Sequence, residues 1–158
     1  MKSPQPVARF AALPLVLYAN KQSGFKTIQD LIAFARQNPG KLNFGSSGAG
    51  SGSHFSGELI KLRTSIDMVH VPYGGAGPST NALLANDVQL IFRGPAGSDT
   101  RFTPLAVLGT ERSNLVPGVP STAESGIPGY FPNSWFGLMV PQGTAPDTVG
   151  LLHKSLTS

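Results

Sequence analysis

The sequence predicts an α/β fold, with a mainly parallel sheet and helices on both of its faces. Apolar runs of strand length alternate with segments whose apolar residues recur at helical spacing, as in successive βαβ units. Two glycine-rich loops, Gly45–Ser53 and Gly74–Gly77, each lie between a predicted strand and a predicted helix. The chain has 158 residues, enough to bury a core, and we expect one domain over residues 1–158.

The first elements are predicted from local patterns. Ala11–Ala19 is an apolar run of the length and composition typical of a buried strand. Lys26–Asn38 then has apolar residues at helical spacing. Thr27 is its expected N-cap, Asp30 stands in the position of a capping-box acid, and a Pro-Gly pair ends it.

The later elements follow the same two periods. Strands are predicted at Leu42–Phe44, Met68–Tyr73, Val88–Phe92, Pro104–Leu108 and Trp135–Val140. Helices are predicted at residues 54–64, Pro78–Ala85 and Pro146–Leu156. Residues 109–134 are rich in proline and are expected to be loop, while residues 135–158 are expected to form a crossover strand and the start of a C-terminal helix.

The composition excludes several classes of protein. The net charge is +4, but the basic residues are scattered and form no run interleaved with aromatic residues, so we expect no nucleic-acid partner. There is no cysteine, and the three histidines are dispersed without an acidic pair, so neither a metal nor a cofactor is expected. No apolar stretch approaches the ~20 residues of a membrane span, and the N-terminal residues lack the apolar region of a signal peptide.

The loop Gly45–Ser53 has the properties of an anion site. Its glycines allow positive φ and a close approach of a ligand to the backbone. It leads into a helix N-terminus, where unpaired N–H groups and the helix dipole favour negative charge. Serine hydroxyls add donors, so a carboxylate, a phosphate or a sulfate would fit.

Three sharper motifs fail in this loop on single residues. A P-loop needs a lysine after Gly50, where this chain has Ser51, and a dinucleotide fingerprint needs a glycine where it has Ser53. A nucleophile elbow misses at Ala49. A serine hydrolase that uses Ser47 with His70 as its base is therefore only the third hypothesis.

The second loop strengthens the binding hypothesis. Gly74–Gly77 follows a strand as the first loop does, and in an open α/β sheet ligands bind beyond the carboxyl ends of the strands. Tyr73 either presents its hydroxyl there or packs at the strand end. His54 either contacts the ligand or packs at the start of its helix.

Several stretches resemble the Bug family of extracytoplasmic solute-binding receptors of tripartite tricarboxylate transporters. The resemblance is carried by PGKLNFGSSGAGSGSHFSGELIK, DMVHVPYGGAGPSTNALLANDVQLIF, LAVLGTERSNLVPGVPSTAESGIPGY and SWFGLMVPQGTAPDTV. It covers most of residues 11–150. It implies one lobe of a Venus flytrap, in which two domains close on a small carboxylic or amino acid.

The resemblance also implies a set of ligand contacts and partners. In that family, main-chain amides and hydroxyls of βα loops hold the ligand carboxylates, often with bridging water. It implies a periplasmic location and membrane transporter subunits as partners. We expect the ligand to be bound by Gly45, Ser46, Ser47, Gly48, Ala49, Gly50, Ser51, His54, Tyr73, Gly74, Gly75, Ala76 and Arg93.

Two features depart from the family pattern. Members are much longer, so this chain corresponds to the second domain and, without the first, is expected to bind weakly. Arg93 stands where the family usually has an acid or amide, and the stretch after it, through Thr100, is shorter.

Without the first domain, the apolar strand Trp135–Val140 would be left exposed, which favours a homodimer. The main alternative function is an interaction or oligomerisation domain without a ligand.

Overall fold

The structure is a computed structural model that describes residues 3–96, 99–129 and 131–157. It divides into two compact units. The central unit is Pro14–Pro132, and the terminal unit combines Met1–Leu13 with Asn133–Ser158. The residues expected to form one domain are thus divided between two units, because the two ends of the chain form a sheet of their own.

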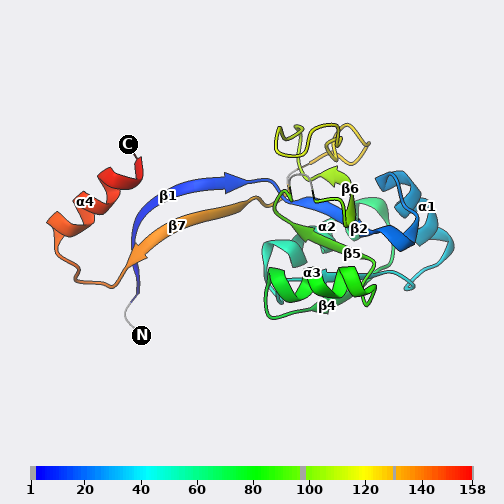
Figure 1. Ribbon diagram of the computed structural model, residues 1–158, viewed down its shortest axis with the longest axis horizontal. Coiled ribbons are helices and arrows are strands. Elements are labelled where there is room, and N and C mark those ends of the chain that lie inside the picture. Colours follow the sequence, from blue (N-terminus) through cyan, green and yellow to red (C-terminus); the bar gives the residue numbers. More distant parts are fainter. Residues whose placement is uncertain (1–2, 97–98, 130, 158) are drawn as a thin grey trace. The chain divides into compact units, whose positions relative to one another are not determined.

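The central unit is built on a five-stranded sheet (Figure 1). Its strands lie in the order β4-β3-β5-β2-β6. They are β2 (Val16–Asn20), β3 (Asn43–Ser46), β4 (Val69–Pro72), β5 (Leu90–Arg93) and β6 (Phe102–Val107). β3 is parallel to β4 and β5, whereas β2 is antiparallel to β5 and β6. Four of the strands therefore run in one direction, and the reversal of β2 makes the sheet mixed.

Helices cover both faces of this sheet, which confirms the predicted α/β class. α1 (Ile28–Gln37) and α2 (Gly52–Thr64) pack on one face through residues such as Leu31 and Ile60. α3 (Ala76–Ala85) packs on the opposite face through Ala82 and Leu83 (Figure 1). A short 3₁₀ helix, η1 (Lys21–Ser23), precedes α1.

The prediction of one strand over Ala11–Ala19 is wrong. β1 (Gln5–Leu13) belongs to the terminal unit, and β2 begins at Val16 in the central unit. Pro14 lies between them, and proline has no N–H to donate to a ladder. The apolar run is therefore two strands in two units, although its composition is continuous.

Other boundaries differ by a few residues for local reasons. α2 begins at Gly52 rather than at residue 54, because the Ser51 hydroxyl caps it by accepting from His54 N. α3 begins at Ala76, so Pro78 lies in its first turn, where proline is tolerated. The capping box of α1 is confirmed, with Thr27 and Asp30 each accepting from the backbone N–H of the other.

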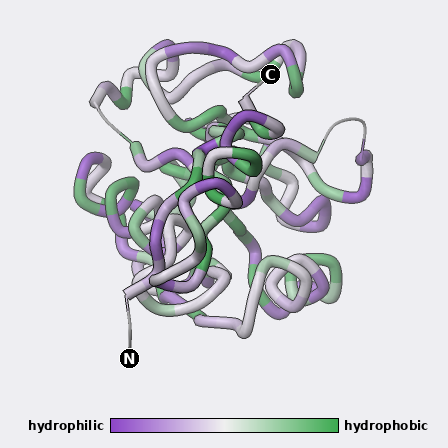
Figure 2. The backbone as a smooth tube through the Cα atoms, turned by 90° about the vertical axis from the view of Figure 1, so that its left-hand side faces the viewer, coloured by the Kyte–Doolittle hydropathy of each residue, from purple (hydrophilic) through white to green (hydrophobic). Residues whose placement is uncertain are grey.

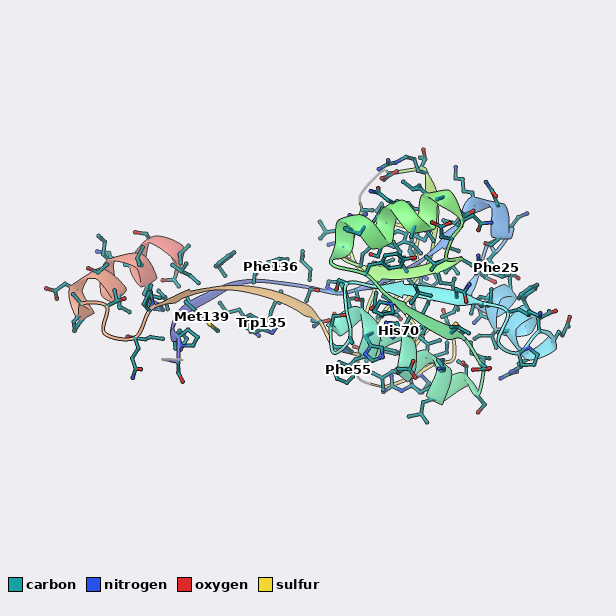
Figure 3. All side chains as sticks on the ribbon, turned by 90° about the horizontal axis from the view of Figure 1, so that it is seen from below. Phe25, Phe55, His70, Trp135, Phe136 and Met139 are labelled. Carbon is teal, nitrogen blue, oxygen red and sulfur yellow. The ribbon has the colours of Figure 1, made fainter. Side chains whose placement is uncertain are left out.

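The terminal unit pairs β1 antiparallel with β7 (Ser134–Val140), from Gln5 opposite Val140 to Leu13 opposite Ser134. α4 (Pro146–Thr157) follows β7, and His153 Nδ1 lies 2.9 Å from the carbonyl oxygen of Val7. The strand predicted at Trp135–Val140 and the helix predicted at Pro146–Leu156 are thereby confirmed. Trp135 and Phe136 stand on opposite sides of the two-stranded ribbon (Figure 3).

Hydrophobic segments along the chain are short and separated by hydrophilic ones (Figure 2). No helix in residues 3–96, 99–129 or 131–157 combines the length and hydropathy needed to cross a membrane. Residues 109–133 form no named helix or strand where they are described, as predicted, whereas Ser134, predicted as loop, is the first residue of β7. Gly97 and Ser98, in the shortened stretch after Arg93, lie outside the described residues.

Candidate functional site

The two glycine-rich loops lie side by side at one edge of the central sheet. β3 and β4 are parallel, with Ser46 opposite Pro72, so both strands end at the same edge. Tyr73 N donates a hydrogen bond of 3.0 Å to the carbonyl oxygen of Ser46, which joins the starts of the two loops. β5 is also parallel to β3, with Gly45 opposite Ile91, so Arg93 ends at this edge as well. We call this edge the carboxyl edge.

Serine side chains hold the first loop through hydrogen bonds within the loop. Ser53 Oγ accepts from Ser47 N at 3.0 Å and lies 3.1 Å from Ser47 Oγ and 2.9 Å from Ser51 Oγ. Ser51 Oγ donates to the carbonyl oxygen of Gly48 at 2.6 Å. The hydroxyls that the sequence offered as ligand donors therefore mainly fix the backbone.

Fixing the backbone leaves main-chain donors at the start of α2. Gly48 and Gly50 have φ of 132° and 78°, values that favour glycine and turn the chain into the helix. Within the part of the chain that the structure describes, the N–H groups of Ala49, Gly52 and Ser53 have no hydrogen-bond partner. Unpaired N–H groups at a helix N-terminus form an anion site.

The second loop ends in a helix start without a side-chain cap. Gly75, the N-cap of α3, has φ 150° and, as a glycine, has no side chain that could cap the helix. Ser79 N donates to the carbonyl oxygen of Gly75 at 3.3 Å, and Pro78 has no N–H. Among the described residues, the N–H groups of Ala76 and Gly77 therefore lack partners. Two helix N-termini with unpaired donors thus meet the carboxyl edge from opposite faces of the sheet.

Three aromatic rings form a stack beneath the first loop. His70 stacks on His54 with ring centroids 4.0 Å apart, and Phe44 stacks on the other side of His70 at 4.9 Å. His70 lies on β4 beside α2 (Figure 3). The two imidazoles contact both ends of the loop, because His70 Nε2 lies 2.6 Å from Ser46 Oγ and His54 Nδ1 accepts from Gly50 N at 3.1 Å.

The imidazole stack also has an electrostatic consequence. Burial lowers the pKa of His70 below its ordinary value of 6.5, and the neighbouring His54 lowers it further. Glu58 and Lys61 on α2 have smaller, opposing effects on this pKa. Since His54 Nδ1 accepts the Gly50 hydrogen bond, a neutral His54 carries its proton on Nε2. The two histidines therefore support the loop through these hydrogen bonds, and the lowered pKa of His70 favours its neutral form.

The structure distinguishes the predicted site residues by their contacts. Ser46 is buried, and its hydroxyl bonds His70 and the backbone of Gly48, so its own contact with a ligand would be indirect. The ring of Tyr73 packs against the α3-side core and approaches Gly45, where a Cβ would lie 3.3 Å from it. Internal hydrogen bonds therefore account for the position of Ser46, and packing accounts for that of Tyr73.

Arg93 lies at the end of β5 beside α3. Its Nη1 donates to Thr80 Oγ1 at 3.2 Å, and its guanidinium lies 5.7 Å from the centroid of the Phe102 ring. Thr80 was not a predicted site residue, since a threonine within a helix carries no sequence signal of such a role. Gly52 and Ser53 were also missed, although both lie in the predicted loop, because the helix was expected to begin at residue 54.

The geometry does not form a hydrolytic centre. The hydroxyl near an imidazole is that of Ser46, while Ser47 Oγ contacts Ser53. The hypothesis of a hydrolase using Ser47 and His70 is therefore wrong. In the described residues, no group of three or more His, Cys, Asp or Glu side chains is placed to hold a metal ion.

The chain is similar to a family of transport receptors over its whole length. Residues 1–158 match the family described as tripartite tricarboxylate transporter family receptor. The chain is 34% identical over 157 residues to a UPF0065 protein in the tcbD-tcbE intergenic region of Pseudomonas sp. (strain P51). It is also 34% identical over 156 residues to Protein BugT of Bordetella pertussis. These matches cover 96% of this chain but 47% and 48% of the relatives, so the chain spans about half their length.

Solved structures are similar in fold as well. A protein of R. palustris with adipate has a TM-score of 0.93 and 33% identity. MatC of Rhodopseudomonas palustris with bound malate has a TM-score of 0.87 and 29% identity. Each match covers 98% of this chain and 54% of the other.

Proposed function

Since this chain belongs to the tripartite tricarboxylate transporter receptor family, we propose that its central unit binds a small carboxylate at the carboxyl edge. The members of this family are solute receptors and not enzymes. The observation that carries the proposal is the pair of helix N-termini at adjacent strand ends. α2 offers the N–H groups of Gly52 and Ser53, and α3 offers those of Ala76 and Gly77. Oriented main-chain donors of this kind stabilise an anion without any basic side chain.

The chemistry of the ligand is proposed from similar structures. Adipate and malate, named with the two R. palustris structures, are both small dicarboxylates. A carboxylate has two oxygens that accept several hydrogen bonds, which suits a cluster of N–H groups. We therefore assign a small carboxylic acid to this site rather than a nucleotide, whose P-loop lysine this loop lacks.

The site is proposed as half of a two-domain receptor. In this proposal Pro14–Pro132 corresponds to the second domain, and the terminal unit to the crossover strands and the start of the terminal helix. A second domain would exclude water and add donors, so the chain by itself binds weakly. A periplasmic location and membrane transporter subunits as partners belong to the same proposal.

A matched pair of substitutions at Gly52 tests the proposal. Gly52 is the first residue of α2, where proline is well tolerated, and its N–H makes no hydrogen bond within the described residues. Ser51 before it has φ −74° and ψ 162°, which a following proline allows. Gly52→Pro therefore deletes one ligand donor and keeps the fold. Gly52→Ala is the control, because its Cβ would lie no closer than 3.7 Å to any neighbour.

Binding of adipate and malate is measured by calorimetry for the three proteins. One hydrogen bond to a charged group contributes about 1.5 kcal/mol or more, so Gly52→Pro should weaken binding about tenfold. Gly52→Ala should bind as the wild type does. Equal affinity in all three proteins, or no binding by the wild type at high ligand concentration, would refute the proposal.

A second candidate function is self-association through the terminal unit. Phe10, Trp135, Phe136 and Met139 on β1 and β7 are 54%, 56%, 52% and 49% exposed. Exposed apolar side chains gathered on one short ribbon favour contact with another protein surface. Sedimentation over a range of concentrations should show a dimer that Trp135→Ser weakens. A monomer at every concentration would exclude this function.

A further inference from the structure

Arg93 lies at the carboxyl edge and forms no salt bridge with a carboxylate of the described residues. Its side chain is half-buried at the end of β5, on the face of the sheet that α3 covers. Among the described residues, the salt bridges are Glu58–Lys61, Asp99–Arg101 and Arg112–Glu124. The guanidinium therefore has no direct ion-pair partner among these described residues.

Asp99 interacts electrostatically with Arg93, but its carboxylate forms a salt bridge with Arg101. Arg101 Nη2 lies 2.7 Å from Asp99 Oδ2, and Arg101 N and Nε also donate to this carboxylate. These hydrogen bonds hold the pKa of Asp99 at about 2, so the carboxylate stays ionised and paired with Arg101. Asp99 therefore makes its direct ion pair with Arg101, and its interaction with Arg93 is the smaller of the two.

Thr80 orients the guanidinium toward the first turn of α3. Thr80 Oγ1 accepts from Arg93 Nη1 at 3.2 Å and itself donates to the carbonyl oxygen of Ala76 at 2.7 Å. Ala76 is the first residue of α3, whose N–H groups at Ala76 and Gly77 lack partners. An arginine side chain has five N–H donors in a planar fork, and Thr80 occupies one of them. Donors therefore remain beside the helix start.

We propose that Arg93 makes this site selective for dicarboxylates, by binding the second carboxylate beside the N-terminus of α3. The first carboxylate then lies on the N–H groups of α2, on the other side of the sheet edge. This inference rests on the proposed carboxylate-binding function and adds the residue that determines ligand charge. A fork of guanidinium donors matches the two oxygens of a carboxylate better than it matches an amide.

The experiment compares adipate with its monoamide, which has the same length but one carboxylate. Calorimetric titrations use the wild type, Arg93→Gln, Arg93→Lys and the control Lys41→Gln. Lys41 is an exposed residue with the same charge, and it precedes β3 at the strand end opposite the carboxyl edge, so its loss changes the net charge equally without touching the site. The measured quantity is the ratio of the two affinities, which a change in stability alone would not move.

The wild type and Lys41→Gln should prefer adipate by about tenfold or more, the usual discrimination from a charge-assisted hydrogen-bond pair. Arg93→Gln should lose this preference by binding adipate more weakly while binding the monoamide as before. Arg93→Lys keeps the charge but not the planar fork, and should show an intermediate ratio.

Two results would overturn the inference. If Arg93→Gln and Arg93→Lys both keep the wild-type preference, Arg93 does not select the ligand, while the proposed function still stands. If the wild type binds neither compound, both the inference and the proposed function fail. Thermal unfolding of each variant in the absence of ligand identifies any variant that does not fold. If one of the two Arg93 variants does not fold, the affinity ratio of the other one tests whether Arg93 selects the ligand.

Discussion

Replacing Gly57 by alanine should destabilise the protein, although alanine is the better helix former. Gly57 lies inside α2, and a Cβ at this position would lie 2.2 Å from Phe44 Cε2 and 2.5 Å from Cζ. Carbon atoms prefer a separation of about 3.5–4.0 Å, so the ring would have to move by more than about 1 Å. Phe44 has little room to move, because its ring contacts His70 at 4.9 Å and Phe92 at 5.8 Å.

The expected magnitude combines two opposing effects. Alanine in place of a helical glycine stabilises by about 0.5–1 kcal/mol. Forcing an extra methyl into a packed core costs about 1–3 kcal/mol, and the short distances at Phe44 favour the upper part of that range. The free energy of unfolding should therefore fall by about 1–2 kcal/mol. Because Phe44 supports His70, Gly57→Ala should also weaken carboxylate binding.

Urea denaturation followed by circular dichroism measures the change, with Gly77→Ala as the control. Gly77 is also helical and in the same unit, but a Cβ there would meet no atom within 4 Å. The control should be unchanged or more stable by up to about 1 kcal/mol. A Gly57→Ala protein as stable as the wild type would refute the argument that Phe44 requires glycine here.

Two further predictions concern the support of the first loop. Ser51→Ala should lower the free energy of unfolding by about 1 kcal/mol and weaken adipate binding, since Ser51 caps α2 and holds Gly48. Thr27→Ala, which removes the cap of α1, should lower the free energy of unfolding by a similar amount without weakening adipate binding. Equal losses of adipate affinity in Ser51→Ala and Thr27→Ala would contradict the assignment of Ser51 to the support of the loop. The pKa of His70 is lower in the folded protein than its ordinary 6.5, so the unfolded chain binds the proton more readily. The free energy of unfolding should therefore fall as the pH drops below 6.5 and level off below the pKa of His70 in the folded protein. In urea denaturation at several pH values, His70→Gln should remove this part of the pH dependence. An unchanged pH dependence in His70→Gln would contradict the prediction.

Local signals in the sequence were sufficient for most of the central unit. The capping box of Thr27 and Asp30 involves residues close in the chain, so sequence shows it directly. The glycine loop between a strand and a helix is likewise a local pattern. The predicted positions of β3, β4, β5 and α3 agree with the structure to within a few residues for the same reason.

Features that depend on distant pairing were not predictable from local patterns. The apolar run Ala11–Ala19 gives no sign that its first part pairs with β7 and its second part with β5 and β6. The reversed direction of β2 has the same cause, because strand direction is decided by partners far along the chain.

The candidate site shows the same division between local and distant signals. The order of strand, loop and helix predicts unpaired N–H donors where the loop meets the helix, but it did not single out Gly52. The stack of Phe44 on His70 depends on the register of β3 against β4, in which the two residues are partners, and could not be predicted. The hydrogen bond from Arg93 to Thr80 joins a strand end to a helix and carries no sequence signal.

Chemical-shift mapping by ¹⁵N–¹H correlation spectroscopy tests the central claim most directly. Adipate is titrated into the labelled protein, and the backbone N–H signals are followed. The largest changes are expected at Gly52, Ser53, Ala76 and Gly77, whose N–H groups lack partners among the described residues. Saturable changes confined to other residues, such as Trp135 in the terminal unit, would contradict the claim that the carboxyl edge binds the carboxylate.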